Sequence, residues 1–113
     1  MGNPLGNMGG MGNLGGMMKQ AKKMYEAAQQ VQDELANERI EAASGGGMVK
    51  AIVTGKGELL SVKIDPQVVD SDDVEMLEDL IITAVREALT KAHEIEAERM
   101  QAVTGGLGMP GMF

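Results

Sequence analysis

The chain of 113 residues contains no cysteine and no tryptophan, and only one tyrosine, one phenylalanine and one histidine. Without cysteine there can be neither a disulfide framework nor a thiolate metal site. With so few aromatic rings, the stacking platforms that bind single-stranded nucleic acids are missing. No run of about 18 apolar residues is present, and the amino terminus lacks the features of a secretory signal. We therefore predict a cytoplasmic protein with no membrane partner.

Residues that would carry catalysis or hold a metal are equally scarce. His93 has no second histidine or cysteine to act with, so a surface position on a helix is the expected role. The acidic run at residues 70–75 lacks the glycine and the spacing of a calcium loop. Neither glycine-rich segment, residues 44–47 or 55–57, matches a loop that cradles phosphates. No nucleophile–base pair is visible. We expect no enzymatic activity, no cofactor, no metal and no small-molecule substrate.

Two glycine-rich ends flank the part of the chain that can fold. Residues 1–16 are nearly all Gly, Asn and Met, and residues 104–113 have a similar composition. Neither end has a periodic apolar face, and ordering glycine costs much backbone entropy. The sequence predicts flexible tails at 1–16 and 104–113, and a single domain at 17–103. A domain this small, built from small and medium-sized apolar residues, often needs a partner subunit, so we expect a homodimer.

Charge is distributed unevenly along the chain, whose formal net charge is −7. Residues 17–63 carry seven cations and six acids, whereas residues 64–113 carry three cations and eleven acids. The overall acidity argues against a nucleic-acid partner, but the position of the cations matters more than their sum.

The first periodic segment predicts a long helix that starts at Leu14 or Met17, with Asn13 as its cap, and ends at Asn37. Its apolar residues alternate in spacings of four and three, which is typical of a helix that packs against another helix. The stripe consists of Met17, Ala21, Met24, Ala28, Val31 and Leu35.

Residues 48–54 and 59–64 are rich in β-branched residues and are joined by the short connection 55–57, so they predict a β-hairpin. Val49, Ala51 and Val53 should share one face of the first strand, and Leu60, Val62 and Ile64 one face of the second. Residues 39–42 fit either a frayed helix end or a short edge strand, with the strand favoured. The sheet would therefore have three strands, or two.

A second long helix is predicted from the acidic run at residues 70–73 to about Val103, with Gly105 and Gly106 ending it. Asp72 and Glu75 have the spacing of a capping box. The helix has a broad apolar stripe suited to covering a core. The predicted fold is α+β: a long helix, a small antiparallel sheet and a second long helix.

The cations on the two helices are the candidate binding residues. Lys19, Lys22 and Lys23 crowd into the first turns of the first helix, where the helix dipole disfavours positive charge. An anionic ligand would explain them, although a solvated helix face is the simpler interpretation. On the second helix, pairing with neighbouring acids such as Glu87 and Glu94 accounts for Lys91. Arg86 and Arg99 stay open as candidates.

Several segments together resemble the YbaB/EbfC family of bacterial nucleoid-associated proteins. They are residues 12–24 (GNLGGMMKQAKKM), 47–50 (GMVK), 62–66 (VKIDP) and 75–81 (EMLEDLI), followed by a Gly/Met/Pro tail that ends in Met112-Phe113. The resemblance covers nearly the whole chain. It implies a tweezer-like homodimer of helix–sheet–helix protomers that binds double-stranded DNA with limited sequence preference at the nucleoid. It also implies DNA contacts on the projecting helices and no catalytic residues.

From the cations and the resemblance, we predict DNA binding through Lys19, Lys22, Lys23, Arg86 and Arg99, with a role in chromosome organisation or transcription. The alternative is a protein-interaction module whose Met-rich helices dock another protein, because methionine surfaces adapt to varied partners. In that case the intrinsic DNA affinity would be small.

Overall fold

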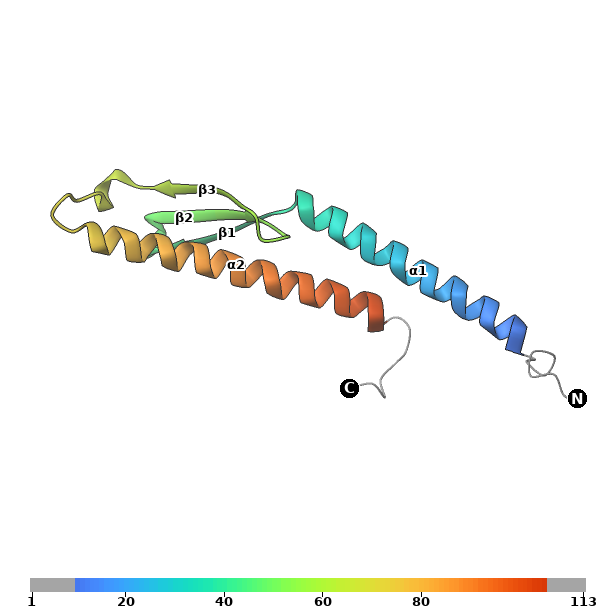
Figure 1. The fold of residues 1–113 in the computed structure, drawn as a ribbon. Coiled ribbons are helices and arrows are strands. Elements are labelled where there is room, and N and C mark those ends of the chain that lie inside the picture. Colours follow the sequence, from blue (N-terminus) through green and yellow to red (C-terminus); the bar gives the residue numbers. More distant parts are fainter. Residues whose placement is uncertain (1–9, 106–113) are drawn as a thin grey trace, which may run out of the picture.

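The computed structural model describes residues 10–105, which form two long helices and a three-stranded sheet (Figure 1). The elements are α1 (Gly10–Asn37), β1 (Arg39–Ser44), β2 (Val49–Thr54), β3 (Leu59–Ile64) and α2 (Val74–Gly105). Short 3-10 turns follow β1 and β3. The expected α+β class is confirmed, and the segment that fitted either a helix end or a strand is the edge strand β1.

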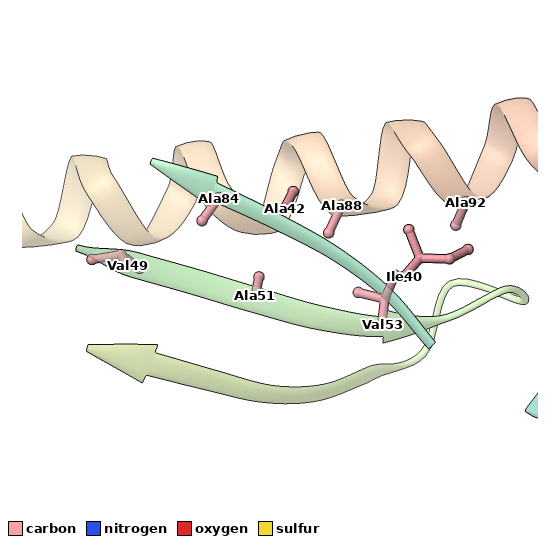
Figure 2. Packing of buried hydrophobic residues seen from close by; sticks show 8 residues of the cluster. All are labelled: Ile40, Ala42, Val49, Ala51, Val53, Ala84, Ala88 and Ala92. Carbon is pink, nitrogen blue, oxygen red and sulfur yellow. The ribbon is translucent and has the colours of Figure 1, made fainter. Parts of the chain in front are cut away.

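The core lies between α2 and one face of the sheet (Figure 2). In β1 and β2, alternate side chains point toward α2, as the two-residue period of a strand requires. The buried set is Ile40 and Ala42 of β1, Val49, Ala51 and Val53 of β2, and Ala84, Ala88 and Ala92 of α2. Because α2 presents alanines to the sheet, its backbone can approach the strands closely.

The strands are ordered β1-β2-β3, and both pairs are antiparallel. The connection between β1 and β2 runs through Gly45, Gly46 and Gly47, all at positive φ, a conformation that only glycine adopts without strain. Between β2 and β3 a bulge shifts the register, so that Ser61 opposes Ile52 while Leu59 opposes Val53. The apolar face predicted for Leu60, Val62 and Ile64 is therefore broken at Leu60, which has no partner in β2. Val62 and Ile64 oppose the buried residues of β2, and Leu59 takes the place expected for Leu60.

α1 forms an arm that projects from the sheet and extends past the end of α2 (Figure 1). Its carboxyl end is anchored by Leu35, which is fully buried, and by a hydrogen bond from the Gly55 amide to the Leu35 carbonyl oxygen at 2.8 Å. Toward the amino end the apolar stripe is uncovered, and Met17 is 64% exposed. The stripe thus packs against α2 only near its carboxyl end.

The helix boundaries differ from those expected. α1 begins at Gly10, so Asn13 lies within the helix and is not its cap, and residues 10–16 are helical instead of part of a tail. α2 begins at Val74 and is capped by Asp73, whose Oδ1 accepts a hydrogen bond from the Met76 amide at 3.2 Å. The capping box predicted from Asp72 and Glu75 is therefore wrong, because Met76 occupies the position where such a box needs Glu or Gln. Residues 1–9 and 106–113, which make up most of the predicted tails, lie outside the described residues.

Candidate nucleic-acid interface

Lys19, Lys22 and Lys23 are exposed and lie in the amino-terminal half of α1, the half farther from the sheet. At about 100° per residue they fall on the side of the helix opposite the apolar stripe. Within residues 14–105, where side chains are described, none of the three lies within ion-pair distance of a carboxylate. The arm therefore carries three uncompensated ammonium groups on one face, and a partner could cover the stripe without hiding them.

The position of these lysines in the helix differs from the sequence interpretation. Because α1 begins at Gly10, Lys19 lies at the end of the third turn and Lys23 in the fourth. The dipole acts mainly within the first turn, so it neither stabilises nor penalises this cluster appreciably. The argument that the lysines oppose the helix dipole is therefore wrong. The lysines remain candidates for binding because they are exposed and because no carboxylate among residues 14–105 pairs with them.

Arg99 is engaged within the protein. Its Nη2 lies 2.6 Å from Oε1 of Glu38, the single residue between α1 and β1. The hydrogen bond to Glu38, more than any other influence, raises the pKa of Arg99 further above its ordinary value, so the guanidinium stays charged. Both side chains are about one-third exposed. The pair joins α2 to the base of the arm, which leaves Arg99 less free than the lysines to meet a phosphate.

A second contact fixes the base of the arm beside the first. Gln32 Nε2 of α1 donates to Glu96 Oε2 at 3.2 Å and lies 3.8 Å from the Met100 sulfur, both in α2. Sequence reasoning missed Gln32 and Glu38 as determinants of the arm's direction. Their partners lie about sixty residues away in the chain, and no local pattern signals such a contact.

The remaining cations of α2 behave differently from one another. Arg86 is exposed in the half of α2 that packs on the sheet, so one protomer does not bring it together with the arm lysines. The predicted pairing of Lys91 with Glu87 or Glu94 is wrong, because neither carboxylate lies within ion-pair distance of its ammonium group. Its Nζ donates instead to the Glu41 carbonyl oxygen of β1 at 3.1 Å.

Sites for other kinds of chemistry are not evident in the described part of the chain. His93 is exposed and lines an open, shallow hollow on α2 with Glu94, Glu96, Ala97 and Met100. Among residues 14–105 no three His, Asp or Glu side chains are gathered so that they could hold a metal ion. None of the helices described here combines the length and the apolarity needed to cross a bilayer.

The fold and its arm define a class of protein, an α+β domain with a projecting, lysine-bearing helix. Comparison with known proteins identifies the family: the model of the YbaB/EbfC DNA-binding family matches residues 11–107, and the chain belongs to this family.

Similar proteins agree with this assignment. A nucleoid-associated protein of Thermoanaerobacter pseudethanolicus is 52% identical over 97 residues, 86% of this chain and 87% of that protein. One of Ruminiclostridium cellulolyticum is 50% identical over 113 residues, 99% of this chain and 96% of the relative. The crystal structure of an uncharacterized Helicobacter pylori protein superposes with a TM-score of 0.63 at 25% identity, covering 75% of this chain and 86% of that one.

Proposed function

We propose that the protein is a nucleoid-associated protein that binds double-stranded DNA as a homodimer with limited sequence specificity, and so organises the chromosome or modulates transcription. The observation that carries the proposal is the projecting arm with three exposed lysines that have no carboxylate partner among the side chains of residues 14–105, in a chain that belongs to a DNA-binding family. Relatives named as nucleoid-associated proteins support the location at the nucleoid.

The principal contacts in this proposal are phosphates held by Lys19, Lys22 and Lys23, with Arg86 as a further contact. Lysine acts on a phosphate as a point charge and reads no sequence, which accounts for the limited specificity. Arg99 acts mainly by holding the base of the arm, because Glu38 already neutralises its guanidinium.

The second copy is proposed to bind along the edge strand β3 and the neighbouring side of α2. α2 packs mainly on β1 and β2 and contacts β3 little, which leaves large apolar side chains uncovered there. We define the apolar strip as Leu59, Leu60, Ile64, Ile82 and Leu89, all at least 37% exposed. An exposed edge strand beside such residues invites pairing with another chain.

A salt titration of duplex binding tests the proposal. The logarithm of the affinity should fall linearly with the logarithm of salt concentration, and the six arm lysines of a dimer should contribute about −5 to the slope if each neutralises one phosphate. A variant with Lys22→Glu and Lys23→Glu should bind much more weakly. The matched control carries Lys56→Glu and Lys91→Glu, the same change of charge at exposed positions off the arm.

Absence of duplex binding by the wild-type protein at low salt would defeat the proposal, and so would equal affinities of the arm and control variants. The rival is an adaptor that docks another protein through methionines, favoured by the exposure of Met17 and Met18, 64% and 65%. A protein partner that stays bound after nuclease treatment, together with absent duplex binding, would favour the rival.

A further inference from the structure

The face of the sheet turned away from α2 carries a group of cations that the arm does not account for. We define the outer sheet face by the strand residues that alternate with the buried ones, namely Arg39, Glu41 and Ala43 of β1, Lys50 and Ile52 of β2, and Ser61 and Lys63 of β3. Three of these seven residues are cations and one is an acid. In a chain with a net charge of −7, this face has a local excess of positive charge.

Two of the cations are direct neighbours. The register places Lys50 opposite Lys63, with Ala43 opposite Lys50 on the other side. Both lysines are exposed, and directly opposed side chains have Cβ atoms about 4.5–5.5 Å apart. Like charges in this relation destabilise a sheet. Among the residues whose side chains are described, no carboxylate lies within ion-pair distance of either ammonium group.

We infer that the outer sheet face is a second phosphate-binding surface for duplex DNA, distinct from the arm. The adjacent phosphates of a DNA strand supply the negative charge that the Lys50–Lys63 pair lacks, and Arg39 extends the positive surface along the sheet. The inference rests on the proposed function, since it assigns a further contact for the same polyanion.

The composition of this face favours a duplex over single strands. None of the residues of the outer sheet face is aromatic, so unpaired bases have no ring on which to stack. Lysine, by contrast, contacts phosphates without regard to sequence, and the backbone of a duplex offers a dense row of them. The surface lies on the sheet, whereas the lysines of the arm lie in the amino-terminal half of α1, which projects away from the sheet (Figure 1).

The test compares duplex binding across salt for the wild type, for Lys50→Gln with Lys63→Gln, and for a control with Lys56→Gln and Lys91→Gln. The control removes the same charge from exposed positions off this face. In a dimer, loss of four phosphate contacts should make the salt slope shallower by up to about 3.6 and weaken low-salt binding well beyond the control. Removing the opposed charges should also raise the melting temperature, by about 1–5 °C.

The outcomes separate this inference from the proposed function. If the wild type binds DNA and the arm variant is weakened, while the Lys50/Lys63 variant matches its control, the outer sheet face is not a DNA surface but the arm assignment stands. A Lys50/Lys63 variant with a lower melting temperature would also overturn the inference, because the lysines would then have a structural role. A wild type that binds no duplex at low salt would overturn both.

Discussion

Gly55 lies so close to the carboxyl end of α1 that the arm can be anchored there only if this residue has no side chain. A Cβ atom at this position would lie 2.7 Å from the Leu35 carbonyl oxygen and 2.9 Å from its Cα. Backbone cannot move aside as a flexible side chain can, so any larger residue would push the arm away from the β2–β3 hairpin.

We therefore expect Gly55→Ala to lower the free energy of unfolding by about 1–3 kcal/mol, measured by chemical denaturation. The matched control is Gly15→Ala with Gly16→Ala, the same chemical change in α1, where an added Cβ meets nothing within 4 Å. The control should leave global stability unharmed and increase helix content, because alanine favours helix over glycine. A Gly55→Ala protein as stable as the wild type would contradict the described packing.

Among the elements, α1 has one apolar stripe in two different environments. Leu35 is fully buried at the base of the arm, whereas Met17 is 64% exposed farther out. Leu35→Ala should cost about 2–5 kcal/mol of unfolding free energy, because it leaves a cavity. Met17→Ala should change stability by no more than about 0.5 kcal/mol. Equal losses in thermal or chemical denaturation would mean that the stripe is covered along its whole length in solution.

The contact between α2 and the base of α1 should limit the range of arm directions. Arg99→Ala removes the ion pair with Glu38, so we expect a broader distribution of distances between spin labels on α1 and α2. Arg86→Ala, at an exposed position without an ion pair in the described residues, is the control and should leave the distribution unchanged. Identical distributions in the two variants would show that Arg99 does not hold the arm.

Long periodic elements were predictable from the sequence, and their junctions were not. Both helices and the buried face of β2 follow from apolar spacing, which persists over many residues. The start of α1 was missed because glycine has a low helix propensity, yet Gly10 is helical. The bulge at β3 and the capping role of Asp73 each depend on a shift of one residue, which composition does not reveal.

In the candidate site, too, local features were predictable from the sequence, whereas contacts between distant segments were not. The exposure of the arm lysines follows from their place opposite the apolar stripe, so the sequence was sufficient to predict that they are exposed, while their binding role stays a prediction. The ion pair of Arg99 with Glu38 and the opposition of Lys50 to Lys63 depend on how distant segments meet. Sequence reasoning therefore identified the separate cations without showing which were neutralised and which stood side by side.

At the scale of the whole molecule, the elongated shape leaves the apolar strip beside β3 and the outer part of α1 without cover in the protomer. The apolar strip should mediate dimer formation, so Ile82→Asp with Leu89→Asp should convert a dimer into an 11.9 kDa monomer in analytical ultracentrifugation. Met18→Asp, which alters an apolar residue of the arm that is 65% exposed, against 50% for Ile82 and 37% for Leu89, is the control and should stay dimeric. A strip variant that remains dimeric would place the interface elsewhere.

The single residue between α1 and β1 has a mechanical consequence. Lys22 lies fifteen residues before the end of α1, about 22 Å along the axis, so a ten-degree rotation at Glu38 would displace it by about 4 Å. That displacement rivals the reach of a lysine side chain. The contacts at this junction, the Arg99–Glu38 ion pair and the Gln32–Glu96 hydrogen bond, therefore set where the distant lysines lie.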